Sequence, residues 1–597
     1  MFETGVYPKF TYREENRMHL LSKAMDPAFW QGVREKECYR AYREELLALY
    51  AKHCESDLIC DLKYSEYKLY WTTGNRSIYE RSYFDRRLAL SAAALLALIY
   101  PDEEKYLTRT CDLLFCICNE YSWCLPAHQG ALDKVDSTRI DLFAAESGFT
   151  LAEIYTMLGA RLDPLIKNRI LCELDRRIFT PFLEKEPYRD AFWEGAPHNW
   201  AAVCMGSVAC TLMLIRPDTA RELIPRFERT MTTYLGGLSD DGICSEGVGY
   251  WHYGFGFFAV YADMVRTFTN GAVDWFKNDK VRLVATFMQK MYLSGMTTVS
   301  YADGSRSNRY LLGLLHYLKD EYPDDILVYA PEYSYNYDSC GRFCFWLRCA
   351  TWLNEETYYH PAPIDSQMTY YAPLLQWMVC KRATYGFSAK GGSNAELHNH
   401  NDVGSFIFAK DGVQCLCDLG SGAYTRQYFD SKQRYTILEC SSRGHSVPII
   451  GGAEQIVSGE GHLQALQGTE QYVGGAAHTR DVVYEDGVLT MDIALAYRAP
   501  GLENLQRTFA CADDHVTLTD EVIYRGEGAV VERLVSLFEP QQLDECTLKV
   551  GTATVTFDPS VCTYALHSEP TTATGQPCYM MDFTLKAGAE KVEFVMR

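Results

Sequence analysis

The first part of the chain has the spacing of apolar residues that is typical of amphipathic helices. Up to about residue 365, apolar side chains recur at positions i, i+3, i+4 and i+7 in successive segments. Examples are residues 86–100, 105–119, 140–158, 200–215, 255–268 and 281–294. Short breaks such as Tyr100-Pro101-Asp102 separate these segments. The pattern predicts an all-α domain of helical hairpins, arranged as a solenoid or a closed toroid.

The pattern changes after about residue 366, where short segments alternate between apolar and polar residues. Such segments occur at residues 404–409, 413–418, 482–484, 488–494, 515–522, 530–538 and 592–596. The dipeptide Asp486-Gly487 between two of them indicates a β-hairpin. Many short strands with turn residues between them predict an antiparallel β-sandwich. We therefore expect an all-α domain over residues 1–365, followed by an all-β domain over residues 366–597.

The net charge of the chain limits the kinds of molecule that it can bind. The chain has 597 residues and a net charge of -21, which argues against a nucleic-acid partner because no global positive field exists. A groove for an anionic ligand would have to be locally basic, and Arg86 is the arginine that we assign to such a site. Other candidates for that lining are Arg87, Arg139, Arg306, Arg309 and Arg443.

The cysteines indicate a reducing environment. The chain has 22 cysteines without a CxxC pair, and many are flanked by apolar residues. The sequence starts without an apolar signal segment, and no run of apolar residues is long enough to span a membrane. We therefore expect a cytoplasmic protein, or a secreted or periplasmic one if a signal segment has been removed. No oligomeric state follows from the sequence.

Two motifs in the helical part carry candidate chemistry. The first is Pro197-His198-Asn199-Trp200 at the start of a predicted helix, where Asn199 is either a helix N-cap or an amide donor to a carboxylate. The second runs from Ser245 to Gly254 and places three glycines among Tyr250, Trp251, His252 and Tyr253. Glycines allow close approach of the backbone, so this segment is either a carbohydrate-facing loop or an aromatic packing corner.

A third motif, Glu396-Leu397-His398-Asn399-His400-Asn401-Asp402, lies in the β part. If this segment is a strand, its residues at i, i+2 and i+4 share one face, which would bring His398, His400 and Asp402 together. Two such histidines indicate either a metal or acid–base site or a structural hydrogen-bonding cluster. Asp418 and His445 follow downstream and could complete a site with two histidines and one aspartate.

These motifs together resemble the heparinase II/III family of polysaccharide lyases, which also includes alginate and oligoalginate lyases. The resemblance rests on His198-Asn199-Trp200, on the stretch Glu246–Tyr253, and on the block from His398 to Phe406 with Asp418, Tyr424 and His445-Ser446-Val447-Pro448. It covers both predicted domains in the right order. It implies an incomplete (α/α) toroid followed by an antiparallel β-sandwich, with the active cleft between them.

The resemblance also implies roles for individual residues. Asn199 is expected to neutralise the uronate carboxylate with help from His198, Tyr253 to be the catalytic tyrosine, and His398 its partner histidine. Tyr250, in the same motif as Tyr253, is the alternative tyrosine. His400, Asp418 and His445 are expected to bind one structural divalent metal, which in this family is usually zinc. We assign Trp200, Glu246, Tyr250, His252 and Asn399, together with Arg86, to substrate binding.

The expected reaction is β-elimination on a glycan that contains uronic acid, such as heparan sulfate, chondroitin, hyaluronan or alginate. It removes the proton at C5 and expels the oxygen at C4, which requires stabilisation of the carboxylate, a base and an acid. The alternatives are a toroid glycoside hydrolase, which needs two catalytic carboxylates, and a glycan-binding protein without activity. The sequence does not distinguish the individual polysaccharide, or exo from endo cleavage.

Overall fold

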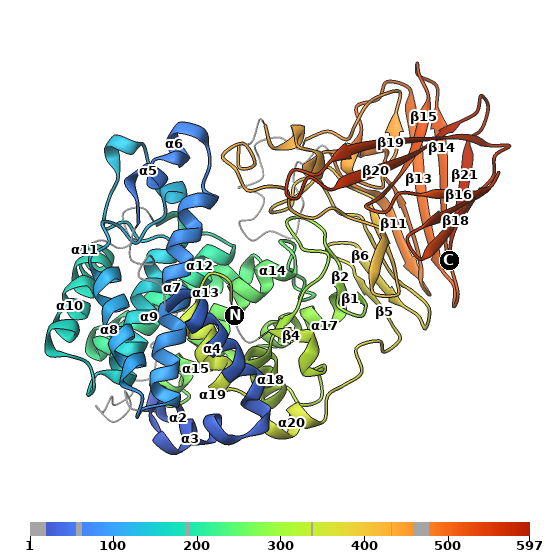
Figure 1. The fold of residues 1–597 in the computed structure, drawn as a ribbon. Helices are drawn as coiled ribbons and strands as arrows, with labels where there is room; N and C mark the ends of the chain where they lie inside the picture. Colours follow the sequence, from blue (N-terminus) through green and yellow to red (C-terminus); the bar gives the residue numbers. More distant parts are fainter. Residues whose placement is uncertain (1–18, 55–61, 185–190, 336–337, 431–432, 458–476) are drawn as a thin grey trace. The chain divides into compact units, whose positions relative to one another are not determined.

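The computed structural model describes residues 19–597 apart from 55–61, 185–190, 336–337, 431–432 and 458–476 (Figure 1). The chain forms two compact units. The helical unit consists of the described residues up to Gly237, His252–Arg282 and Tyr310–Ala362. The β unit consists of Leu238–Trp251, Leu283–Arg309 and Pro363–Arg597. Two segments that precede residue 363 thus belong to the β unit.

The helical unit is a succession of helices, of which the longer ones begin and end as follows: α4 Arg40–Cys54, α7 Ser77–Ile99, α8 Glu104–Cys118, α9 Leu142–Leu158, α10 Pro164–Leu174, α12 Asn199–Ile215, α13 Pro217–Gly236, α15 Gly256–Phe268, α18 Leu312–Glu321 and α19 Phe343–Thr351. Shorter helices are α2 Ser22–Met25, α3 Pro27–Glu35, α5 Tyr64–Tyr67, α6 Leu69–Thr73, α11 Thr180–Glu184, α16 Asp279–Ala285 and α20 Glu355–Tyr359. Neighbours in the chain pack pairwise, and α19 returns to pack against α7 and α9. This closure is what a toroid of helical hairpins requires.

Helices α9 and α12 form the centre of the helical unit. Their sequences, LFAAESGFTLAEIYTML and NWAAVCMGSVACTLMLI, are apolar on nearly every face, and almost all their side chains are buried. A helix that is apolar all round is stable only inside a core. The two helices pack against each other, and α13 and α15 pack against α12. Helix α12 begins at the candidate site residue Asn199, which the core therefore holds in place.

The β unit contains three main antiparallel sheets. A five-stranded sheet has the order β5-β6-β7-β8-β9, an eight-stranded sheet the order β11-β12-β13-β14-β21-β18-β17-β16, and a four-stranded sheet the order β10-β15-β20-β19. The strands are β5 Met368–Ala372, β6 Trp377–Lys381, β7 Gly386–Lys390, β8 Phe406–Lys410, β9 Val413–Leu416, β10 Ile449–Ile450, β11 Arg480–Glu485, β12 Val488–Asp492, β13 Leu502–Cys511, β14 Val516–Tyr524, β15 Val530–Ser536, β16 Gln541–Asp544, β17 Thr547–Val550, β18 Ala553–Phe557, β19 Cys562–Pro570, β20 Pro577–Leu585 and β21 Lys591–Met596.

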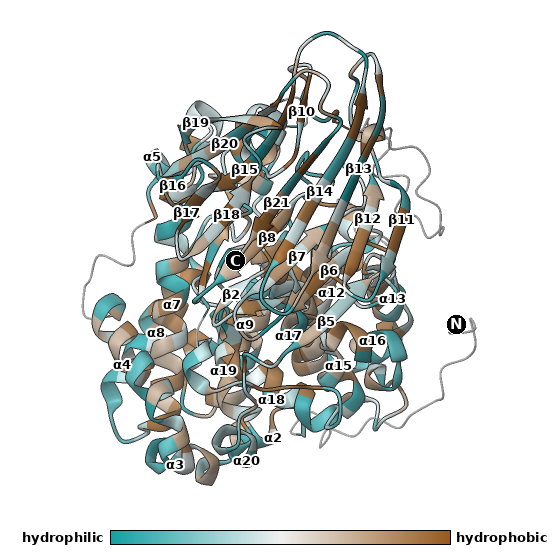
Figure 2. Cartoon of the chain, turned by 90° about the vertical axis from the view of Figure 1, so that its right-hand side faces the viewer, coloured by the Kyte–Doolittle hydropathy of each residue, from teal (hydrophilic) through white to brown (hydrophobic). Residues whose placement is uncertain are grey.

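One hydrophobic core joins these sheets. It includes Phe387 and Phe408 of the five-stranded sheet, Phe509 and Phe594 of the eight-stranded sheet and Phe583 of the four-stranded sheet. Apolar and polar residues alternate along β13 and β14, so that one face of each strand enters this core (Figure 2). This packing of antiparallel sheets confirms the predicted β-sandwich.

The segment 283–309 is built into the β unit by close backbone contact. At Gly386, the first residue of β7, an added Cβ would lie 2.1 Å from the carbonyl oxygen of Leu293. Leu293 lies in the short strand β1, Tyr292–Ser294, which pairs with β2, Thr297–Thr298. A side chain at Gly386 would therefore displace the segment that leads to Asp303.

The expected helix over residues 281–294 is interrupted at Thr286 and is wrong in its last three residues. The structure has α16, then α17 Phe287–Met291, and then strand β1. The apolar residues of β1 are buried by its contacts with β6, β7 and β8, so tertiary packing overrides the helical spacing. The other predicted helices, and the predicted hairpin at Asp486-Gly487 between β11 and β12, are confirmed.

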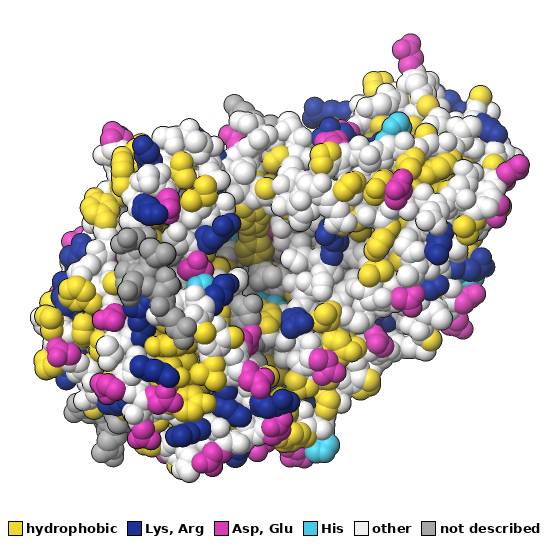
Figure 3. Space-filling model, in the orientation of Figure 1, with side chains coloured by type: hydrophobic (Ala, Val, Ile, Leu, Met, Phe, Trp, Pro, Cys, Tyr) yellow, Lys and Arg dark blue, Asp and Glu magenta, His cyan; other side chains and the backbone are white. Residues whose placement is uncertain are grey.

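In the part of the chain that the structure describes, no helix is both long enough and apolar enough to cross a membrane. Residues 1–18, on which the expectation about a signal segment rests, lie outside that part. Acidic and basic side chains are interspersed over the visible face of the helical unit (Figure 3). The acidic residues that give the chain its net charge of -21 are thus not concentrated in one area of that face.

Candidate active site and metal centre

The candidate residues form one group in each unit, and the first group begins at helix α12. His198 is the N-cap of α12, and its ring Nδ1 accepts a hydrogen bond of 3.4 Å from the backbone N–H of Trp200. Asn199 is the first residue of the helix and is 3% exposed. The N-cap interpretation of Asn199 is therefore wrong. Among the described residues, the Asn199 carboxamide has no hydrogen-bond partner, so it is available to a ligand.

Tyr253 is carried by a turn that packs closely against Asn199 because of a glycine. It belongs to a π-helical turn, Trp251–Phe255, that leads into α15. A Cβ added at the next residue, Gly254, would lie 3.1 Å from the Cβ of Asn199 and 2.9 Å from the hydroxyl of Tyr234. The absence of a side chain at Gly254 thus allows the turn that carries Tyr253 to pack against the start of α12.

The hydroxyl of Tyr253 donates a hydrogen bond to a buried carboxylate, Glu146 of α9. The guanidinium of Arg342 lies 3.9 Å from the centre of the Tyr253 ring, and its Nε is 3.2 Å from Glu146 Oε2. Arg342 is fixed in turn by Asp338, at 2.7 Å. Tyr253 therefore has a proton acceptor at its hydroxyl and a cation over its ring.

Burial dominates the electrostatics of this group. Desolvation raises the pKa of Glu146 to about 7, although Arg342 and the Tyr253 hydroxyl both favour the charged form. Burial and the negative charge of Glu146 also raise the pKa of Tyr253 well above its ordinary value. Tyr253 is thus a neutral phenol at rest, and Glu146 changes charge near neutral pH.

Three further residues assigned to substrate binding lie in the helical unit. The Trp200 ring packs edge-on against His128 at 4.9 Å, and His128 is held by Asp141, the N-cap of α9, at 2.7 Å. His252 is buried, which lowers its pKa to about 3, so its ring is neutral. Arg86 is also buried, with its Nη1 2.7 Å from Glu120. The substrate roles of Trp200, His252 and Arg86 stay predictions.

The second group, in the β unit, is organised around Asp303, whose side chain is fully buried. Its carboxylate accepts hydrogen bonds from His398 Nδ1 at 2.5 Å, from the Tyr424 hydroxyl at 3.1 Å, from Arg434 Nη2 at 2.9 Å and from the Tyr428 hydroxyl. Burial alone would raise the pKa of Asp303, but His398 and the other donors hold it well below its ordinary value. Asp303 in turn raises the pKa of His398 against the opposing effect of burial.

His398 does not lie on a strand. Residues 394–405 form a turn-rich loop between β7 and β8, and His398 has a φ of 55°. The prediction of a strand over residues 396–402 is therefore wrong, because a strand excludes the left-handed backbone conformation that His398 adopts. Asp402, which the strand would have placed beside the histidines, instead pairs with the buried Lys390 at 2.7 Å.

The ring of His398 contacts two further residues of the β unit. The Tyr250 ring stacks on it with centroids 4.5 Å apart, and Glu246 Oε1 lies 3.4 Å from its Nε2. The hydroxyl of Tyr250 is 3.0 Å from that of Tyr424. Of the two candidate tyrosines, Tyr250 thus contacts His398, whereas Tyr253 contacts Glu146.

Backbone contacts fix the loop on both sides of His398. Arg434 Nη2 donates to the carbonyl of His398 at 2.9 Å while it also binds Asp303. The amide of Asn399, assigned to substrate binding, accepts a hydrogen bond from the Tyr435 hydroxyl at 2.8 Å and donates to the carbonyl of His400 at 3.1 Å. These contacts give Asn399 a structural role in the loop, and its contact with substrate stays a prediction.

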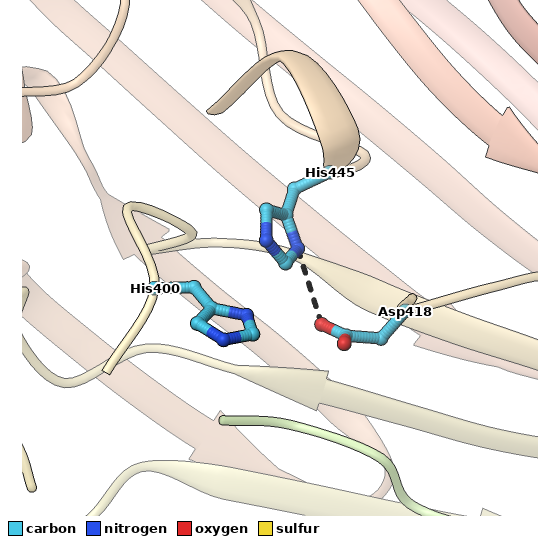
Figure 4. Close-up of side chains that lie close together, drawn as sticks. All are labelled: His400, Asp418 and His445. Atoms are coloured by element: carbon cyan, nitrogen blue, oxygen red, sulfur yellow. Dashed lines mark ion pairs between the residues drawn. The ribbon is translucent and has the colours of Figure 1, made fainter. Parts of the chain in front are cut away.

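His400, Asp418 and His445 converge on one point in the β unit (Figure 4). One ligand atom from each residue lies within 4.8 Å of the others, and all three side chains are fully buried. His445 Nδ1 and Asp418 Oδ2 lie 3.1 Å apart, and His400 Nδ1 is a buried atom without a hydrogen-bond partner among the described residues. The residues therefore fit a divalent metal ion, since buried polar atoms without partners are otherwise costly.

The outward atoms of the two metal-site histidines are held by other groups. His445 Nε2 is 2.8 Å from the carbonyl of Glu439, and His400 Nε2 is 3.4 Å from Asp303 Oδ1. Such contacts orient the other ring nitrogen of each histidine towards the proposed metal position. Asp303 thereby connects the metal-site residue His400 to His398.

A buried arginine ties the loops of this site to the sheets. Arg507 of β13 donates hydrogen bonds of 2.9 Å to the carbonyls of Gly404 and Ser446, which lie in the loops that carry His400 and His445. Its remaining nitrogens bind Asp520 of β14 and Glu532 of β15 at 2.7 to 2.9 Å. We call this set the Arg507 clamp.

Sequence reasoning missed Asp303, Glu146, Arg342 and Arg434. Asp303 stands in Tyr301-Ala302-Asp303-Gly304, which has the appearance of an ordinary turn. Glu146 did carry a signal, because it is one of only two charged residues in the otherwise apolar segment of α9. A charged residue in a helix that must be buried all round indicates a paired or functional group.

The comparisons with known proteins concern the fold. The sequence matches no protein-family model and no curated protein. A crystal structure of heparinase III matches 100% of this chain and 86% of its own, with 13% identity and a TM-score of 0.58. Heparan sulfate lyase HepC from Pedobacter heparinus matches 97% of this chain and 86% of its own, with 12% identity and a TM-score of 0.56. Chondroitin AC lyase from Streptomyces coelicolor matches 98% of this chain and 82% of its own, with 10% identity and a TM-score of 0.54. The chain therefore has the fold of toroid polysaccharide lyases, as the motifs implied.

Proposed function

We propose that the protein is a polysaccharide lyase that cleaves uronate-containing glycans by β-elimination and releases unsaturated oligosaccharides. The observation that carries this proposal is the close packing of the turn that carries Tyr253 against the start of α12, where Asn199 lies. Among the described residues the Asn199 amide has no hydrogen-bond partner, and the proton of the Tyr253 phenol has an acceptor, Glu146. Fold similarity to lyases of heparan sulfate and chondroitin supports the same conclusion.

Asn199 serves to stabilise the negative charge that develops on the uronate. The C5 proton is weakly acidic while the neighbouring carboxylate keeps its full charge, and this charge grows as the proton leaves. An amide that donates to the carboxylate lowers the barrier, by about 3 kcal/mol for a well-placed donor. Because Asn199 is buried and preorganised at the start of α12, it does so without rearrangement.

Tyr253 is the proton carrier. Its phenolic proton passes to the Glu146 carboxylate, and the phenolate oxygen then takes the C5 proton of the sugar. The oxygen at C4 leaves with a proton from the re-formed phenol, and Glu146 returns its proton to Tyr253. Arg342 stabilises the transient phenolate through its position over the ring. On the basis of its sequence motif, we assign His398 to the same reaction, as the residue that adds positive charge near the uronate carboxylate.

The metal has a structural role in this proposal. His400, Asp418 and His445 would hold one divalent ion, and imidazole and carboxylate ligands suit zinc. When bound, the ion supplies no chemistry to the substrate but fixes the loop that carries His398. The residues of the chain perform the proton transfers.

The test is the product formed from a panel of heparan sulfate, chondroitin, hyaluronan and alginate oligosaccharides. A lyase produces a new ultraviolet absorbance, from the C4–C5 double bond, in step with new reducing ends. Reducing ends without that absorbance would show a hydrolase, and binding without either product would show a glycan-binding protein. Each of these two results would overturn the proposal.

A further inference from the structure

The helical unit contains a cavity of about 670 Å³ that the proposed reaction does not use. It lies among α5, α7, the end of α8 and the loop that follows α8. Its walls include Tyr64, Tyr67, Tyr79, Arg86, Phe115 and Tyr121. Its volume is in the range of sites that bind small ligands.

The rim of the cavity is aromatic and exposed. The exposed fractions of Tyr64, Phe115 and Tyr121 are 67%, 43% and 70%. Folding alone gives no reason to gather three exposed rings around one opening, because large apolar side chains are stabilised by burial. Such rings offer flat apolar faces that suit the C–H faces of pyranose sugars.

The interior adds polar groups to these rings. The hydroxyl of Tyr67 is buried and has no hydrogen-bond partner among the described residues, which is costly unless a ligand satisfies it. Arg86 and Glu120 are both 2% exposed at their side chains and are 2.7 Å apart, so they form a rigid polar wall. A cavity with aromatic faces and fixed hydrogen-bonding groups suits a sugar better than an apolar ligand.

The rim is also held in place. The backbone carbonyls of Glu120 and Tyr121 both accept hydrogen bonds from the buried Arg177. The ring of Tyr121 therefore projects from an anchored backbone, although the ring itself is exposed. This arrangement lowers the entropy lost when a ligand stacks on the ring.

Buried ion pairs join the cavity wall to the residues around Tyr253. Arg87 Nη2 lies 2.9 Å from the carboxylate of Glu120 and 3.0 Å from the hydroxyl of Ser147. Ser147 is the neighbour of Glu146 in α9, and Glu146 binds the Tyr253 hydroxyl. The cavity and the proposed proton carrier are thus parts of one rigid framework of α7 and α9.

From these observations we infer that the cavity is a second saccharide-binding site, which holds pyranose rings of a glycan by stacking on Tyr121 and hydrogen bonding to Tyr67. The identity of that glycan as a uronate chain rests on the proposed function. The site would favour substrates long enough to reach it, and so would affect KM for long chains most.

The experiment uses Tyr121→Ala and Tyr67→Phe, with Tyr359→Ala as the matched control. Tyr359 is a tyrosine of the same unit that is 53% exposed and lies outside the cavity. Binding of heparan sulfate, chondroitin and alginate hexasaccharides is measured by calorimetry in a Tyr253→Phe background, and KM is measured in the active protein. Circular dichroism checks that each variant is folded.

We expect each cavity variant to weaken hexasaccharide binding and raise KM about fivefold or more, and the control to match the parent. Binding and KM at the parent's values in both cavity variants would overturn the inference, even if unsaturated products form. The two proposals can fail separately. If no unsaturated product forms, the proposed reaction fails. If Tyr121→Ala nevertheless weakens hexasaccharide binding while the control Tyr359→Ala does not, the saccharide site stands.

Discussion

Glu146 places a carboxyl group where burial disfavours its charge, directly behind the phenol of Tyr253. This arrangement costs stability at neutral pH, and in the proposed reaction it supplies a proton acceptor with a pKa of about 7. Arg342 offsets part of the cost by its contacts with both residues. The roles of these three side chains can be separated by conservative substitutions.

Replacement of Tyr253 by phenylalanine should lower turnover by roughly 100- to 10,000-fold, because only the proton-carrying hydroxyl is lost. The matched control is Tyr42→Phe, which removes the buried hydroxyl bonded to the carbonyl of Trp346 in the same unit. That control should cost about 1 kcal/mol of stability and leave turnover unchanged. Steady-state rates measure the turnover of both variants, and thermal melts measure their stability. Activity near the parent value in Tyr253→Phe would exclude Tyr253 as the proton carrier.

The Glu146→Gln variant should remove a pH dependence of the rate. In the parent, the rate should rise as the pH increases through about 7, since only the ionised Glu146 accepts the phenolic proton. The variant should be slower and lack this rise. The control is Glu228→Gln, because Glu228 is a buried carboxyl of the same unit with a pKa of about 7 that also accepts a tyrosine hydroxyl, from Tyr261 at 2.6 Å. A persistent inflection near pH 7 in Glu146→Gln would contradict the assignment.

The same raised pKa predicts a change in stability with a definite sign. Between the ordinary pKa of about 4.5 and the folded value of about 7, the folded protein holds a proton on Glu146 that the unfolded chain has released. The free energy of unfolding should therefore fall as the pH rises through this window. Denaturant titrations at pH 5 and pH 8 should show a smaller fall for Glu146→Gln than for the parent.

At the scale of elements, Gly254 determines how closely the π-helical turn of Tyr253 approaches α12. In Gly254→Ala, the new methyl group would press on Asn199 and on the Tyr234 hydroxyl, which should cost about 1–3 kcal/mol and reduce turnover by moving Tyr253. Gly249→Ala, in the same motif, is the control because a Cβ there meets nothing within 4 Å. Equal stability and activity of the two variants would show that the close packing does not position the site.

The metal-site loops should depend on a bound ion for their stability. Elemental analysis of the purified protein should find about one divalent ion per chain, and a chelator should lower the melting temperature by several degrees through lost binding energy. His445→Ala should do the same, whereas His567→Ala should not, because His567 is exposed in β19. A protein free of metal that melts at the same temperature with and without chelator would leave the three residues as a hydrogen-bonded cluster.

The elements differ in how far the sequence could predict them. Apolar spacing located α7, α9 and α12 and most strands, since burial dictates that spacing. It failed at residues 396–402, where an alternating sequence folds as a loop because His398 takes a left-handed conformation and bonds to Asp303. Asp303 lies 95 positions from His398 in the chain, and no local pattern shows that tertiary folding brings them together.

At the scale of the whole molecule, the net charge of -21 opposes a polyanionic substrate at long range. Raising the ionic strength from 0.01 to 0.15 M shortens the screening length from about 30 Å to about 8 Å. We therefore expect kcat/KM on a charged polymer to increase over this range, with little change in kcat. Initial rates from product absorbance measure this, and a steep decrease in kcat/KM would show that local basic residues dominate the encounter.

The Arg507 clamp has a consequence for the order in which a newly made chain can mature. All three metal ligands leave the ribosome before Arg507, and Asp520 and Glu532, which hold Arg507, follow still later. The carbonyls of Gly404 and Ser446 therefore lack their anchor until β13, β14 and β15 have been synthesised and paired. A nascent chain halted before residue 500 carries all three proposed ligands yet should fail to retain an ion, so loading of the proposed metal would be a late, largely post-translational event.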